Sequence, residues 1–181
     1  MTPATTFYAT TGTIITQLQA AVEGVQLPEG FDPAGPAFGN VELFDAENLA
    51  DAFAYLTIVE QRVCVIVPLS ETIETISQGM KLIVRRVRPV ALIISDRVIG
   101  SRKEALWGNA TTPGAMGLME LTLPAVCGQL IDNPNGVVSE PSHVSVMSVK
   151  DTAKKLPNRI AVILEVKCRG GRLEAPITAV P

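Results

Sequence analysis

The stretch KLIVRRVRPVALIIS, residues 81–95, decides how this chain folds. Apolar and β-branched residues dominate it, which predicts one long β-strand. Its outer half, residues 84–88, carries three arginines, whereas residues 89–95 have the composition of a buried strand. Because side chains alternate between the two faces of a strand, Arg86 and Arg88 share one face. We expect that face to meet solvent or the acids of a partner, and not the core.

Other segments predict further strands around this one. RVCVIVP at 62–68 is a nearly continuous β-branched run, which is typical of a strand covered on both faces. Residues 69–80 connect it to the arginine strand, and we interpret them as a projecting hairpin or loop. VELFD at 41–45 predicts a short strand. SHVSVMSVKD at 142–151 and RIAVILEVKC at 159–168 predict a closing antiparallel hairpin.

Apolar residues at spacings of three and four predict amphipathic helices at 13–25, 45–60 and 114–131. Asp45 is placed to cap the second helix. Thr112 is expected to cap the third, with a proline in its first turn, a kink at a second proline and the DNPNG segment at its end.

The predicted fold class is α+β: a mixed or antiparallel β-sheet flanked by two to three helices, with a projecting β-hairpin. The 181 residues suit a single domain. Residues 1–12 and 170–181 are interpreted as flexible tails.

The composition favours a protein that buries surface against partners. Hydrophobic residues make up 47% of the chain and charged residues only 18%, which leaves little charge to cover a free-standing domain. No apolar run approaches the roughly 18 residues of a membrane helix, and no basic segment precedes a signal-like stretch. Cys64, Cys127 and Cys168 are odd in number and lie among apolar neighbours, which favours a reducing interior.

Charge is distributed unevenly along the chain. Residues 1–61 contain eight acids and no Lys or Arg, whereas residues 62–103 contain eight bases and three acids. Opposite charge on two faces favours head-to-tail contacts between identical subunits. The alternative is that the two segments neutralise each other within one monomer.

No pattern of catalytic residues stands out, so we predict no catalytic, cofactor-binding or metal-binding residues and no enzyme activity. His143, the one histidine, has no acid or cysteine beside it in sequence. The usual motifs of acyl transfer, zinc hydrolysis and P-loop chemistry are missing from the sequence. Cys64 and Cys127 are expected to behave as buried thiols of raised pKa. Capping explains the GNATTPGAMG turn without a bound phosphate.

The basic residues could also indicate nucleic-acid binding, through the arginine strand and the CRGGR segment. The chain is acidic overall, however, and none of its eight aromatic residues lies within the basic cluster to stack on bases. We therefore predict no sequence-specific nucleic-acid binding. Because the sequence contains no apolar run of membrane-helix length, we also predict no membrane association.

Taken together, the order of elements resembles the tail-terminator proteins of tailed bacteriophages. The segments that carry this resemblance are RVCVIVP, VRPVALIIS and PGAMGLMELTLPAVCGQLI. The resemblance implies a non-catalytic virion protein, assembled in the host cytoplasm, that caps the tail tube as a ring of six subunits. It also implies three further partners: the tail-tube protein, a neck or head-completion protein and, in a contractile tail, the sheath protein.

In this interpretation the arginine strand contacts acids of a neighbouring subunit. The hypothetical interface residues are Arg85, Arg86, Arg88, Glu42, Asp45, Glu47 and Asp51. Alternatives are another neck or baseplate component, a small cytosolic α+β binding module, or an enzyme in which Trp107, His143 and an acid converge.

Overall fold

A computed structural model describes residues 11–31, 34–44, 49–59, 61–78, 81–128, 130–131, 137–146, 156 and 158–176. Within these residues the fold is α+β, as the sequence predicts, and seven strands form one mixed, curled sheet. The strands are β1 (Asn40–Leu43), β2 (Val63–Pro68), β3 (Thr72–Gln78), β4 (Lys81–Arg97), β5 (Leu130–Ile131), β6 (Val137–Val146) and β7 (Arg159–Pro176). The helices are α1 (Thr11–Glu23), α2 (Leu49–Ile58), α3 (Arg102–Trp107) and α4 (Gly114–Val126).

The sheet is built around β4 and β7, which pair antiparallel along their whole common length, from Lys81 opposite Pro176 to Arg97 opposite Arg159. The strand order is β1-β2-β4-β7-β6-β5, and β3 pairs with β4 alone. All described pairings are antiparallel except β1 with β2. The predicted strand at 81–95 is therefore confirmed and continues to Arg97.

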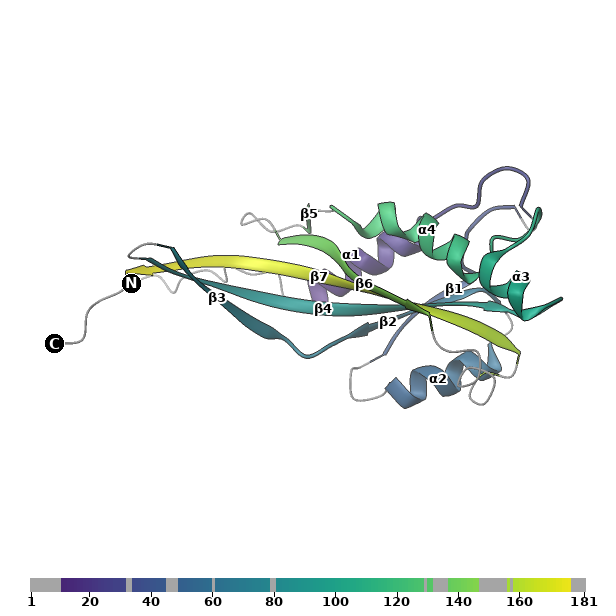
Figure 1. Cartoon of the computed structure of the whole chain (residues 1–181), viewed down its shortest axis with the longest axis horizontal. Helices are drawn as coiled ribbons and strands as arrows, with labels where there is room; N and C mark the ends of the chain where they lie inside the picture. Colours follow the sequence, from purple (N-terminus) through teal and green to yellow (C-terminus); the bar gives the residue numbers. More distant parts are fainter. Residues whose placement is uncertain are drawn as a thin grey trace.

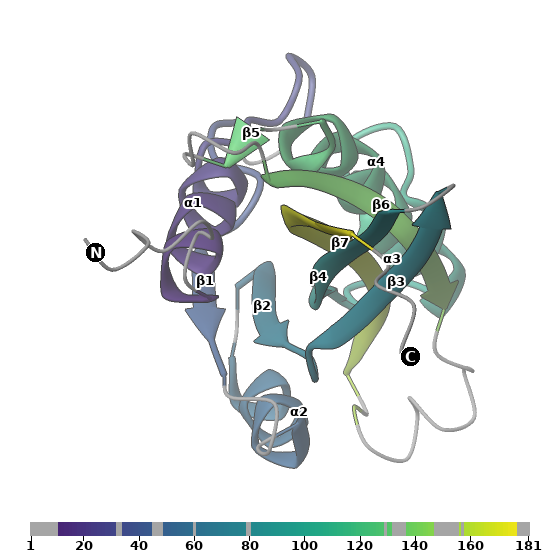
Figure 2. The same ribbon diagram turned by 90° about the vertical axis from the view of Figure 1, so that its left-hand side faces the viewer.

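Helices cover both faces of the sheet, as Figures 1 and 2 show: α1, α3 and α4 lie on one face and α2 lies on the other. Alternate residues of β4 supply the two resulting cores. Leu92 and Ile94 pack with residues of α1 and α4, whereas Ile93 packs with residues of α2 such as Leu56. This explains why the inner half of β4 has no polar alternation, since both of its faces are buried.

Three boundaries at the C-terminal side differ from the sequence prediction. β7 continues through residues 170–176, so that part of the predicted tail is wrong; residues 177–181 lie outside the described residues. β6 begins at Val137, five residues before the predicted strand. α4 ends at Val126 and not at the DNPNG segment, because Gly128 adopts a left-handed φ of 72° that ends the helix.

Two helix starts also differ. α3 was not predicted, although its sequence forms a capping box: the Ser101 hydroxyl accepts from the Glu104 amide and the Glu104 carboxylate accepts from the Ser101 amide. The prediction of Thr112 as the cap of α4 is wrong, since Pro113 is the N-cap residue and the Thr112 hydroxyl donates to Asn109 Oδ1. Asp45, the predicted cap of α2, lies outside the described residues.

Candidate functional site

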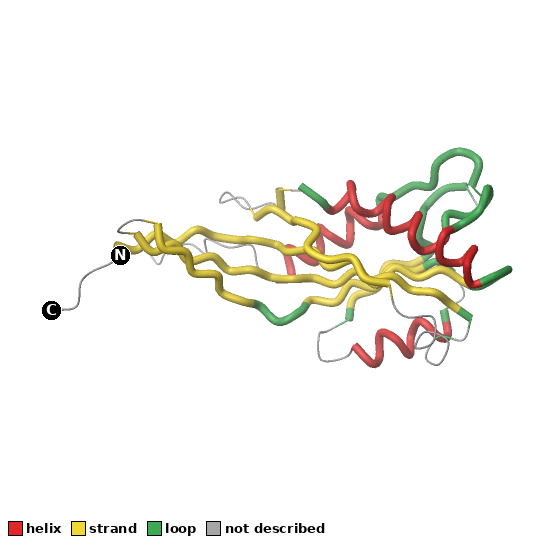
Figure 3. Tube along the Cα trace, in the orientation of Figure 1, coloured by secondary structure: helices red, strands yellow, loops and turns green. Residues whose placement is uncertain are grey.

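Beyond the helix-covered body the sheet narrows to three strands, which we call the arm: β3, residues 81–88 of β4 and residues 169–176 of β7. Figure 3 shows these strands extending past the helices at one end of the molecule. β3 pairs with β4 from Thr72 opposite Val87 to Gln78 opposite Lys81. The prediction of a projecting hairpin is therefore confirmed.

The central feature of the arm is a carboxylate held by two arginines. Arg86 contacts Glu71 through both Nε and Nη2, with Nη2 donating to Oε2 at 3.0 Å. Arg88 Nε donates to the same Oε2 at 3.2 Å. The Glu71 pKa is held below its usual value, first by the hydrogen bond from Arg86 and also by the charge of Arg88. Two guanidinium groups therefore share the Glu71 carboxylate.

Exposure separates the two arginines. The Arg86 side chain is 41% exposed, whereas the Arg88 side chain is 8% exposed and the Glu71 side chain 28% exposed. We therefore expect Arg86 to be accessible to a partner and Arg88 to be part of the folded arm. The prediction that both arginines line a face outside the core holds for Arg86 and is wrong for Arg88. The buried Arg88 is accommodated because Glu71 neutralises it.

A second ion pair lies on the opposite face of the arm. Arg169 Nε lies 3.7 Å from Glu74 Oε2, and both side chains are about one-third exposed. In the backbone pairing, Arg85 lies opposite Glu74 in β3 and Arg172 in β7. Next to it, Arg86 pairs with Gly170, so one residue of β7 is unmatched and forms a bulge. Glycine favours such a bulge.

The predicted acidic residues lie in the body. Glu42 of β1 accepts from Asn40 Nδ2 at 2.8 Å and from the Tyr55 hydroxyl at 3.4 Å. Asp51 lies exposed in the first turn of α2. Asp45 and Glu47 lie outside the described residues. Within one chain, Arg86 and Arg88 are held by Glu71, which is not among the predicted interface residues.

At the opposite end of the sheet lies a groove of about 800 Å³. Its lining is apolar on the Phe38 side and carries Arg62, Asp96, Arg97 and Glu104. Asp96 is buried; Arg62 Nε lies 3.7 Å from its Oδ1, which also accepts from the Arg97 amide at 2.8 Å. Burial raises the Asp96 pKa, and the nearby Arg62 opposes that rise.

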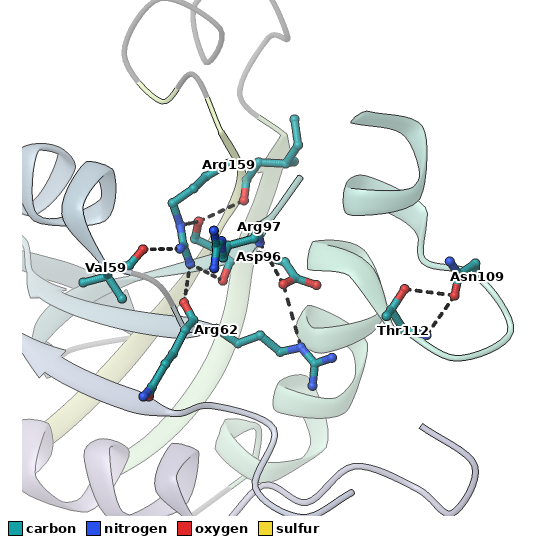
Figure 4. A network of polar contacts seen from close by, with 10 residues as sticks. Val59, Arg62, Asp96, Arg97, Asn109, Thr112 and Arg159 are labelled. Carbon is teal, nitrogen blue, oxygen red and sulfur yellow. Dashed lines mark hydrogen bonds and ion pairs between the residues drawn. The ribbon is translucent and has the colours of Figure 1, made fainter. Parts of the chain in front are cut away.

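A buried arginine, Arg159, lies close to Asp96 and Arg97, two residues of this groove, as Figure 4 shows. The Arg159 side chain donates to the carbonyl oxygens of Val59 at 2.7 Å, Gln61 at 2.6 Å and Ser95 at 3.2 Å, and to Ser95 Oγ at 3.0 Å. Burial lowers the Arg159 pKa. These contacts join the end of α2 to β4 and β7, so Arg159 is a structural tie in the body.

The remaining candidate groups give little support for catalysis. Burial raises the pKa of the Cys64 and Cys127 thiols, and raises that of Cys168 to about 12. Trp107 is 61% exposed, and the His143 side chain lies outside the described part of the structure. Among the described residues, no cluster of His, Cys, Asp and Glu is suited to hold a metal ion. None of the described helices has the length and apolar character needed to span a membrane.

Comparison with known proteins assigns no family. No family model matches the chain, and no curated protein matches it.

Proposed function

We propose that this chain is a structural assembly protein of the tail-terminator type, which forms a ring and caps the end of a phage tail tube. The observation that carries the proposal is the arm, a three-stranded extension that leaves the helix-covered body and contains more basic than acidic residues. A projecting, charged sheet on a compact body is suited to reaching a neighbouring subunit.

The distribution of charge supports head-to-tail contacts. The accessible Arg86 lies on the arm, whereas the acids Glu42 and Asp51 lie in the body. When unlike charges occupy separate places on one subunit, a rotated copy can bring them together. Within the proposal, Arg86 lies close to the contact between one copy and the next. Arg88 supports the arm through Glu71.

The proposed partners follow from this role. The ring would contact the tail-tube protein on one side and a neck or head-completion protein on the other, with the sheath protein as a further partner in a contractile tail. The mature protein would be part of the virion. Exposed apolar side chains such as Ile58, Ile99 and Trp107 give the body additional surface for such contacts.

Native mass spectrometry of the purified chain, with and without tail-tube protein, tests the proposal. We expect a closed ring, and we expect Arg86→Glu to shift the population towards monomer at low salt. Arg97→Glu is the matched control, because Arg97 is also exposed but lies in the body. Circular dichroism establishes that both variants fold. A wild-type chain that stays monomeric at every protein and salt concentration, with or without tube protein, would overturn the proposal.

The groove favours a second candidate function, that of a small-molecule binding module. Its volume of about 800 Å³ is within the range of ligand pockets. A thermal-shift screen of small carboxylates and phosphates against the wild type and Arg62→Ala tests this function. Stabilisation that the variant loses would support it, and no stabilisation by any compound would count against it.

A further inference from the structure

Among the residues that the structure describes, two edges of the arm have no paired strand. Within the described residues, no strand pairs with β3 on its side away from β4. On the other edge, the pairing of β6 with β7 stops at Val138 opposite Arg169, and no described strand pairs with residues 170–176 of β7 on that side. Both edges therefore leave backbone N–H and C=O groups for another strand.

The two edge segments have similar lengths and lie beside the same stretch of β4. β3 lies opposite residues 81–87 of β4, and residues 169–176 of β7 lie opposite the same seven residues. Each is antiparallel to β4, so β3 and the outer half of β7 run in the same direction.

β3 lacks the usual protection of an edge strand. It contains no proline and no lysine, and it exposes two isoleucines: Ile73 is 68% exposed and Ile76 is 43% exposed. A seven-residue edge strand with exposed apolar side chains is a site for pairing with another chain. We infer that the strand that pairs with β3 is the outer half of β7 from a second copy of this chain.

Charge favours this pairing over the pairing of two β3 strands. β3 carries Glu74 and no base, whereas residues 169–176 carry Arg169, Arg172 and Glu174, so the two edges have opposite net charge. Two β3 strands side by side would add acid to acid and would leave both β7 edges open. Pairing β3 with β7 uses both edges of every copy and repeats from copy to copy.

The inference rests on the proposed ring and defines its contact. When the arms lie along the ring axis, rotation from one copy to the next preserves strand direction. β3 of one copy then pairs parallel with β7 of its neighbour. Three strands from each subunit form one closed sheet around the axis, which leaves no open edge on the arms.

A pair of engineered cysteines tests this contact in the full chain. Thr75 and Leu173 both pair with Val84, from opposite sides. Two strand spacings of about 4.8 Å separate them, beyond the roughly 7 Å that a disulfide spans between Cα atoms. A disulfide between Thr75→Cys and Leu173→Cys therefore forms between copies and not within one.

Mild oxidation of the double variant, followed by a non-reducing gel, should give bands at successive multiples of the chain mass. Cys127→Ser removes the partly accessible native thiol, since Cys64 and Cys168 are buried. Ile73→Cys and Ser77→Cys, each with Leu173→Cys, test the neighbouring registers. Each single variant is the matched control, and circular dichroism identifies any variant that does not fold.

The outcomes distinguish failure of the proposed strand contact from failure of the proposed ring. A ladder from a double variant, with monomer from each single variant, supports the inference. Dimers from Thr75→Cys alone would overturn it in favour of pairing between two β3 strands. No cross-link from any folded double variant, while native mass shows a ring, would overturn the contact and leave the ring. A monomeric native mass would overturn both the strand contact and the ring.

Discussion

The two halves of β4 belong to one continuous strand but are stabilised in different ways. In the body half, Leu92, Ile93 and Ile94 are fully buried, and helices cover both faces of the sheet. In the arm half, buried Ile83 and Val87 lie among three arginines, and Glu71 holds two of these arginines. The body is therefore stabilised by apolar packing, whereas the arm is stabilised in part by ion pairs.

Arg159 and Arg88, both buried, also differ between body and arm. Arg159 in the body donates to backbone carbonyl oxygens and to the Ser95 hydroxyl. Arg88 in the arm is paired with one carboxylate, Glu71. Carbonyl acceptors do not titrate, but a carboxylate does. We therefore expect the stability of the arm to change with pH in a range where the hydrogen bonds of Arg159 do not change.

Matched isoleucine truncations should give the largest contrast between body and arm. We expect Ile93→Ala to lower the free energy of unfolding by about 4 kcal/mol, because it leaves a cavity in a fully buried site. Ile73→Ala removes the same atoms from a side chain that is 68% exposed, and should cost about 1 kcal/mol or less. Urea unfolding measures both. Equal losses would show that the arm is packed as tightly as the body.

Removal of the Arg159 guanidinium should give the next largest effect. Arg159→Met keeps much of the side-chain volume but leaves the carbonyl groups of Val59 and Gln61 without this donor. We expect a loss of about 2–4 kcal/mol by urea unfolding. Arg97→Met, at an exposed position, is the control and should change stability by about 0.5 kcal/mol or less. A loss of similar size in the control would contradict the role of Arg159 as a tie.

The division between body and arm also shows what the sequence could predict. The continuous apolar run at 89–95 defines a strand buried on both faces, and the arginines correctly mark where the body ends. The ion partner could not be predicted, because Glu71 is fifteen residues from Arg86 and meets it only through the register of the hairpin. The length of β7 was missed because its glycines resemble a tail, although β4 provides a pairing strand throughout.

Charge removal at Glu71 should destabilise the arm moderately and in a pH-dependent way. Glu71→Gln keeps the shape but removes the anion between Arg86 and Arg88, and we expect a loss of about 1 kcal/mol at neutral pH. The folded pKa of Glu71 is lowered, so its contribution is fully present above the unfolded pKa, near 4.5. It is lost as pH falls through the folded pKa.

Urea unfolding of wild type and Glu71→Gln between pH 7 and pH 3 measures this difference. The two stability curves should run apart above about pH 4.5 and converge as the solution becomes more acidic. A constant gap across the range would contradict the ion pair as the cause.

The smallest effect should come from the pair on the other face of the arm. Glu74 and Arg169 lie 3.7 Å apart, and each side chain is about one-third exposed, so water and salt screen their attraction. Glu74→Gln should therefore lower stability by about 0.5 kcal/mol or less, and added salt should remove most of that difference. Glu71→Gln is the matched comparison, because it also removes one carboxylate from the arm. Glu71, however, is paired with two arginines, and one of them, Arg88, is buried. Equal losses of stability for Glu74→Gln and Glu71→Gln, with no effect of salt, would contradict this expectation. They would show that the burial of Arg88 does not strengthen its ion pair with Glu71.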